Sequence, residues 1–167
     1  MKLWIAQGFG VGRIPFAPGT FGSVVGLAWF ALLLWARSWV VFGVGAAAGI
    51  ALSVWLCGEG EKRLGKRDPG SVVLDEIIAM PLCFISAMAL ALAHQHQWPG
   101  PEYFFSAAHR LQTGGVFVLF RLFDIWKPFP IRQSQSLYGG VGITIDDVLA
   151  AGYVDLVILA VNMVVPL

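Results

Sequence analysis

Five long apolar runs, separated by short polar stretches, set the strongest limit on how this chain can fold. They cover Phe21–Trp35, Trp39–Cys57, Ile77–Ala93, Tyr103–Phe123 and Val148–Leu167. About 20 apolar helical residues span a bilayer core, and only structures that satisfy their own backbone hydrogen bonds cross it. The sequence therefore predicts an all-α, polytopic helical membrane protein. We expect one membrane-embedded domain over residues 1–167, with about four to five membrane-associated helices.

The composition agrees with a membrane environment. Of the 167 residues, 57% are hydrophobic and 13% are charged, about half the charged share of an average soluble protein. The net charge is +1, so the charge balance gives no reason to expect a nucleic-acid partner. Cys57 and Cys83 both lie in apolar stretches and are expected to be packing residues rather than a disulfide.

The distribution of basic residues predicts the orientation in the membrane. If all five runs cross, then Lys2 and Arg13, the basic loop 62–67 and the basic loop 121–132 fall on one side, and Arg37 falls on the other. Cytoplasmic loops carry the excess of Lys and Arg, so the N-terminus is predicted to be cytoplasmic. The fourth run contains polar residues, which leaves four crossings as an alternative. Four crossings would separate the two basic loops, so the charges favour five.

Carboxylates at the borders of the apolar runs are the candidate functional groups. They are Asp75, Glu76, Asp124, Asp146 and Asp147, with Glu61 nearby in the sequence. An Asp at the centre of a membrane helix costs roughly 2.5 to 3.5 kcal/mol on insertion scales. Ionisable groups retained near a membrane therefore indicate a functional site.

Two interpretations of the paired acids remain open from the residues alone. Asp75–Glu76 and Asp146–Asp147 each precede an apolar run, where one acid would serve as a helix cap. Two acids at each start exceed what a cap requires, and several carboxylates at one face repel one another. A divalent cation relieves that repulsion, and an all-oxygen set suits Mg²⁺, Mn²⁺ or Ca²⁺ rather than zinc. We therefore expect a metal site in preference to caps and ion pairs.

Arg121, Asp124 and Lys127 follow a spacing of three residues and would share one helix face. They predict either a surface ion-pair ladder or a phosphate site in which Arg121 and Lys127 bind the anion. In the second interpretation Asp124 orients the two cations or binds metal.

The segment APGTFGS, residues 17–23, precedes the first run and contains two glycines and two hydroxyls. Thr20 or Ser23 is expected to cap the helix, or to help bind an anion at its N-terminus.

A cysteine-phosphatase loop is a weaker alternative. Cys57, Gly60 and Arg63 fit the CxxGxxR spacing. Glu59 and Glu61 lie inside that loop and would repel a phosphate, so a Cys nucleophile is not expected.

Four motifs in this order resemble the phosphatidylglycerophosphatase A family. They are APGTFGS, the Asp75–Glu76 pair, FRLFDIWKPFPI from Phe120, and GGVGITIDDVLAA from Gly139. The resemblance implies a membrane-embedded, Mg²⁺-dependent phosphatase that converts phosphatidylglycerophosphate, a membrane phospholipid, to phosphatidylglycerol. It also implies a bacterial cytoplasmic (inner) membrane setting, with the active site facing the cytoplasm. The family's frequent Gly three residues after the glutamate is Ala79 here.

The resemblance places the family's invariant acids at Asp75, Glu76, Asp124, Asp146 and Asp147 and its basic pair at Arg121 and Lys127, and Glu61 and Asp68 match acidic positions of its central loop. The resemblance does not assign a separate role to each acid. Taken together with the residue patterns, it gives the expected catalytic acids as Asp75, Glu76, Asp124, Asp146 and Asp147, the expected substrate-binding residues as Thr20, Ser23, Arg121 and Lys127, and the expected metal ligands as Asp75, Glu76, Asp146, Asp147 and Glu61.

The expected reaction is hydrolysis of a phosphate monoester, with one Asp acting as general base or as a nucleophile. Without a plausible Ser–His or Cys–His pair, metal-activated water is the favoured nucleophile. A cation-binding transporter built on the same acids is the alternative from another class, but it would place acids near the middle of several spans. A phosphatidyltransferase would need a D-G-x-x-A-R pattern, which this sequence lacks.

Overall fold

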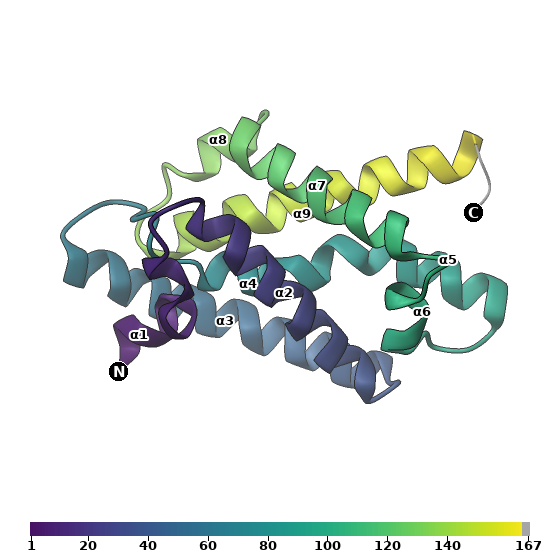
Figure 1. Cartoon of the computed structure of the whole chain (residues 1–167). Helices are drawn as coiled ribbons and strands as arrows, with labels where there is room; N and C mark the ends of the chain where they lie inside the picture. The colour runs from purple at the N-terminus through teal and green to yellow at the C-terminus, as the bar shows by residue number, and fades with distance from the viewer. Residues whose placement is uncertain (165–167) are drawn as a thin grey trace.

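Helices make up all the regular structure in residues 1–164, which are the residues that the computed structural model describes (Figure 1). In chain order they are α1 (Lys2–Ala6), the 3₁₀ helix η1 (Gly8–Arg13), α2 (Pro18–Trp35), α3 (Trp39–Leu64), α4 (Leu74–Ala79), the 3₁₀ helix η2 (Met80–Phe84), α5 (Ile85–Gln95), α6 (Pro101–Phe105), α7 (Arg110–Trp126), α8 (Ile131–Ser134) and α9 (Gly140–Val164). The all-α fold class is confirmed.

The long helices run back and forth between two ends of the molecule. Figure 1 shows α1, α8 and the start of α9 at one end, which we call the α1 end, and α6 at the other, the α6 end. Within residues 1–164, four helices are long and apolar enough to cross a membrane: α2, α3, the stretch Leu74–Gln95 and α9. The protein is thus a multi-pass membrane protein. Helix α7 has 17 residues and returns the chain from the α6 end to the α1 end, so a fifth crossing stays a prediction.

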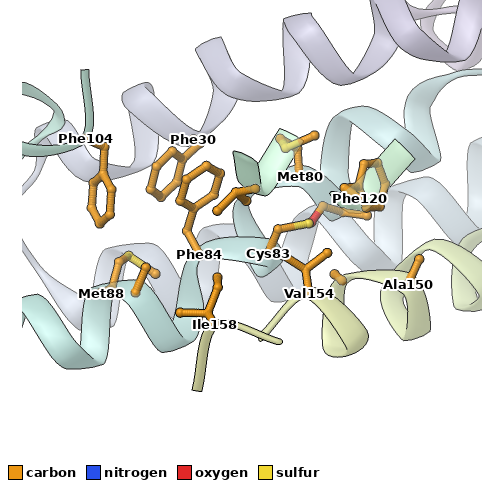
Figure 2. Close-up of a cluster of buried hydrophobic side chains, with 14 of the residues drawn as sticks. Phe30, Met80, Cys83, Phe84, Met88, Phe104, Phe120, Ala150, Val154 and Ile158 are labelled. Atoms are coloured by element: carbon orange, nitrogen blue, oxygen red, sulfur yellow. The ribbon is translucent and has the colours of Figure 1, made fainter. Parts of the chain in front are cut away.

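Aromatic packing at the centre joins the helices. Phe30 of α2 stacks on Phe84 of η2 with ring centroids 4.1 Å apart, and Phe104 packs edge-on against both (Figure 2). Val154 and Ile158 of α9 close the same cluster from the other side. Between helices in a bilayer, this packing stabilises the fold through van der Waals contact and not through removal of apolar surface from water. Other large apolar side chains on α3, α7 and α9 are exposed, as expected for surfaces that face lipid.

Several helix boundaries differ from the sequence-based expectation. The expected run Tyr103–Phe123 is interrupted at residues 106–109, between α6 and α7. Two other differences move candidate site residues. Helix α3 continues past Cys57 to Leu64, so Glu61 lies on a helix and not in a loop. Helix α9 begins at Gly140 and not at Val148, so Asp146 and Asp147 lie in its second turn. The predicted hairpin between the first two runs is confirmed: residues 36–38 form the turn, and the Ser38 hydroxyl caps α3 by accepting from the Val41 N–H.

Candidate active site

Five carboxylates from three helices meet at the α1 end. Asp75 and Glu76 lie in the first turn of α4, Asp124 in the last turn of α7, and Asp146 and Asp147 in the second turn of α9. All five border one cavity of about 160 Å³, which is also lined by Asp68, Gly70, Val72 and Lys127. Residues from position 68 to position 147 therefore share one small polar space inside an apolar protein.

The alternative interpretation, in which the paired acids cap helices, is wrong. The N-cap of α4 is Val73, and no side chain makes a capping hydrogen bond there. The first turn of α9 contains no acid, because that helix begins at Gly140. These acids therefore make no capping hydrogen bond at the start of α4, and they lie beyond the first turn of α9. Helix capping does not explain their presence.

The carboxylates are buried in two overlapping groups. Asp75, Asp146 and Asp147 are only 6%, 3% and 2% exposed. Asp75, Glu76 and Asp147 form one group whose ligand atoms lie within 4.8 Å of one another, and Asp124, Asp146 and Asp147 form the other. Buried Asp75 Oδ1 and Glu76 Oε2 have no hydrogen-bond partner. Buried anionic oxygens without partners are costly, so this all-oxygen donor set fits a hard divalent cation.

Arg121 connects α7 to two other helices. Its Nη1 lies 2.9 Å from Asp124 Oδ2 and 3.9 Å from Glu76 Oε1, and it donates to Ser23 Oγ at 3.3 Å. The guanidinium thus stands at the edge of the carboxylate cluster, where it can bind one edge of a phosphate.

Lys127 provides the second cation. It ends α7 in a left-handed conformation with φ 48°, immediately before Pro128, which cannot continue the helix. Its ammonium donates to Asp146 Oδ2 at 2.6 Å and lies 4.0 Å from Asp124 Oδ1. Burial by itself would lower the pKa of Lys127, but the hydrogen bond and the charges of Asp146 and Asp124 outweigh burial and raise it above its ordinary value. Lys127 is therefore protonated throughout the physiological range.

The APGTFGS segment does not cap α2 as expected. The N-cap of α2 is Ala17, without a side-chain hydrogen bond. Ser23 is fully buried in the second turn, donates to the Gly19 carbonyl at 2.9 Å and accepts from Arg121. Thr20 lies in the first turn, half-buried, and its role in substrate binding stays a prediction. Gly19 allows close approach, because a Cβ there would meet the Glu76 carboxylate and lie 3.1 Å from Arg121 Nη2.

Sequence reasoning missed Gln135, at the end of α8. Its Nε2 lies 3.1 Å from Asp146 Oδ2 and also 3.1 Å from Asp68 Oδ2. The amide thus connects the cluster to the loop between α3 and α4. No spacing rule could have found it, because α8 has four residues and only tertiary contacts place it. Asp68 resembled a family position in sequence, and the structure adds it to the cavity wall.

Glu61 lies apart from the cluster. It belongs to neither carboxylate group in the described residues and instead borders two other hollows with Arg67 and Gly139, one of which Gln135 also lines. The cysteine-phosphatase loop is also excluded, because residues 57–63 are helical and Cys57 is fully buried.

Comparison with known proteins identifies relatives of this chain. The family model for phosphatidylglycerophosphatase A matches residues 4–162. The chain is 36% identical to phosphatidylglycerophosphatase A of Escherichia coli K12 over 87% of this chain and 74% of that protein. It is 37% identical to phosphatidylglycerophosphatase A of Haemophilus influenzae over 95% of this chain and 86% of that protein. It is also 35% identical to a putative phosphatidylinositol-3-phosphatase of Bacteroides thetaiotaomicron, over 99% of this chain and 96% of that protein.

No solved structure matches the chain significantly. The matched region contains every residue of the cluster, from Ser23 of α2 to Asp147 of α9. On the combined strength of the family model and these relatives, the chain belongs to the phosphatidylglycerophosphatase A family.

Proposed function

We propose that this enzyme, a phosphoric monoester hydrolase by its family, converts phosphatidylglycerophosphate to phosphatidylglycerol in a Mg²⁺-dependent reaction. One observation carries the proposal. The five carboxylates of the cluster, together with Asp68 and Lys127, line a single cavity at the ends of helices that are apolar enough to cross a membrane. A lipid can reach such a site with its acyl chains among the helices and its phosphate at the water interface.

Mg²⁺ fits the donor set. Asp75, Glu76 and Asp147, and separately Asp124, Asp146 and Asp147, bring carboxylate oxygens close enough for one ion. The unpartnered oxygens of Asp75 and Glu76 independently favour a cation there. When bound, Mg²⁺ neutralises phosphate charge and makes a bound water more acidic.

The side chains of the cluster then have separable tasks. Arg121 and Lys127 bind the phosphate oxygens and neutralise charge that develops as the ester bond breaks. A cluster carboxylate accepts the proton of the attacking water. The three histidines, at positions 94, 96 and 109, all lie near the α6 end, away from the cluster, which favours a carboxylate over histidine as base. Trapping with hydroxylamine tests the other route, in which an Asp attacks phosphorus and forms an acyl phosphate.

We place the α1 end at the cytoplasmic face of the inner membrane. All Lys and Arg residues except Arg37 and Arg110 belong to elements at or near that end. This distribution is the positive-inside pattern. Labelling of cells with a membrane-impermeant maleimide tests it. The Arg37→Cys variant should react with the maleimide in intact cells, and the Lys62→Cys variant should react only after lysis. The two native thiols are buried and supply a low background. Reaction of the Lys62 variant in intact cells would reverse the orientation.

Phosphate release from purified protein tests the activity. Phosphatidylglycerophosphate should be hydrolysed with Mg²⁺ and spared with EDTA, and Asp75→Asn should abolish release while the protein elutes as a folded species. The relative named as a putative phosphatidylinositol-3-phosphatase makes a phosphoinositide monophosphate the right competing substrate. A higher kcat/KM for that lipid would replace the proposed headgroup. Full activity in EDTA would refute the metal requirement.

The transporter alternative expects acids along the length of the spans. Asp155 lies closer to the middle of its span, α9, than Asp146 and Asp147 do, and it accepts a hydrogen bond from the Ser86 N–H at 2.8 Å. It is therefore already engaged in holding the start of α5. Cation uptake into proteoliposomes without phosphate release would support the transporter.

A further inference from the structure

Asp147 is common to both carboxylate groups. Its partners are Asp75 and Glu76 in the first group, and Asp124 and Asp146 in the second. One carboxylate has two oxygens and can serve two cations at once, and paired ions in phosphate-transferring sites lie about 3.5 to 4 Å apart. The cavity of about 160 Å³ opens onto both groups.

The first carboxylate group contains buried oxygen atoms that lack a partner. Asp75 is 6% exposed, lines the cavity and has an Oδ1 without a hydrogen-bond partner. Glu76 Oε2 is buried and also unpartnered, and within residues 1–164 Glu76 has one ion pair, with Arg121 at 3.9 Å from its other oxygen. A metal ion at this position would compete with one long ion pair, the 3.9 Å contact between Arg121 and Glu76, and, among the described residues, with no hydrogen bond from a Lys or Arg side chain.

The second group is already compensated by protein cations. Arg121 lies 2.9 Å from Asp124, and Lys127 donates to Asp146 Oδ2 at 2.6 Å. Gln135 Nε2 lies 3.1 Å from the same Oδ2 atom. A metal ion that binds this oxygen must take it from a charge-assisted hydrogen bond, which is among the stronger polar contacts in proteins.

We propose that the cluster binds two divalent cations of unequal affinity that share Asp147. The tighter ion is held by Asp75, Glu76 and Asp147, and the weaker one by Asp124, Asp146 and Asp147 in competition with Lys127. This inference deepens the proposed Mg²⁺-dependent function and rests on it. Its consequence is an exchange of partners: the second ion takes Asp146, and the Lys127 ammonium is released toward the substrate phosphate.

Mn²⁺ binding to the purified full-length protein in detergent tests the inference without any turnover. The six-line electron paramagnetic resonance signal of free Mn²⁺ reports how many ions bind and how tightly. We expect two Mn²⁺ per chain, with dissociation constants at least about tenfold apart. At saturation the bound ions should show exchange coupling, which needs two ions that share a ligand. Asp146→Asn should remove the weaker ion and keep the tighter one.

Lys127→Gln gives the sharpest result. Removal of the competing ammonium should tighten the weaker site about tenfold and leave the tighter site unchanged. Lys127→Arg retains a cation and should leave both sites close to wild type. Lys62→Gln removes an equal charge from an exposed side chain outside the cavity, and serves as the matched control for net charge.

The outcomes separate this inference from the proposed function. One Mn²⁺ per chain in a protein that still releases phosphate would overturn the two-ion proposal and leave the function standing. Two ions whose affinities do not respond to Lys127→Gln would overturn the competition. No bound Mn²⁺ together with metal-independent phosphate release would overturn both the inference and the Mg²⁺ dependence.

Discussion

Gly19→Ala should reduce catalysis strongly while leaving stability nearly unchanged. A Cβ at Gly19 would come closer than 3.0 Å to Glu76 Oε1, and 3.1 Å and 3.3 Å from the two terminal nitrogens of Arg121. Both neighbours are the far ends of flexible side chains, so they can move and the backbone need not. The helix gains between zero and about 1 kcal/mol from the alanine, which offsets part of the strain.

The catalytic cost follows from the displacement. To regain ordinary contact beyond 3.4 Å, the Glu76 carboxylate must retreat by about 1 Å, and a misplacement of that size costs on the order of 100-fold in rate. That factor corresponds to about 2.7 kcal/mol of transition-state stabilisation. The loss should fall on kcat more than on KM if Glu76 acts through the metal.

Phosphate release from phosphatidylglycerophosphate in mixed micelles measures the effect, alongside the midpoint of thermal unfolding. Gly152→Ala is the matched control, because a Cβ at Gly152 meets nothing within 4 Å on the helix that carries Asp146 and Asp147. The control should keep full activity. If Gly19→Ala retained more than half of wild-type activity, the position of the Glu76 carboxylate would not govern the chemistry. If it unfolded the protein, the backbone and not Glu76 would have moved.

Three further substitutions test separate parts of the structure. Gln135→Ala removes the amide that contacts Asp146. It should lower kcat/KM about tenfold without changing the unfolding midpoint, because a hydrogen bond to a charged group is worth roughly 1.5 to 3 kcal/mol. Unchanged kinetics would show that Gln135 does not contribute to the site. Asp155→Leu leaves the Ser86 N–H without its acceptor, and should lower stability by about 1 to 3 kcal/mol, whereas Asp155→Asn keeps an acceptor oxygen and should be milder in denaturant titration. Gly140→Ala places a methyl group against a backbone carbonyl of α3, so the chain should accumulate poorly in the membrane, and normal expression with normal thermal stability would contradict that close contact.

Much of the architecture could be predicted because apolar length and charge are local signals. The apolar runs marked the helices, and the antiparallel course of successive helices brought the acids at run borders to one end. The pairing of Arg121 with Asp124 also followed from helical spacing.

The boundaries at α3 and α9 could not be predicted in the same way. The stretches that follow Cys57 and precede Val148 contain charged and polar residues, so the apolar runs are predicted to stop there. In the structure Gly58 lies within α3 and Gly140 begins α9. The two helices pack closely there, since a Cβ on Gly58 would lie 3.0 Å from the Gly140 backbone nitrogen. Tertiary packing therefore overrides intrinsic propensity. The same reason hid Gln135, whose position depends on contacts with Asp68 and Asp146 and on no periodic pattern.

The position of the cavity at the ends of the apolar helices has a kinetic consequence. A diacyl substrate reaches that end by lateral diffusion within the bilayer, and only the released phosphate leaves through water. Turnover should therefore follow the mole fraction of substrate in the lipid surface and not its bulk concentration. Enzyme and lipid substrate therefore meet within the plane of the membrane. Diluting the substrate with inert phospholipid at constant total substrate should slow the reaction.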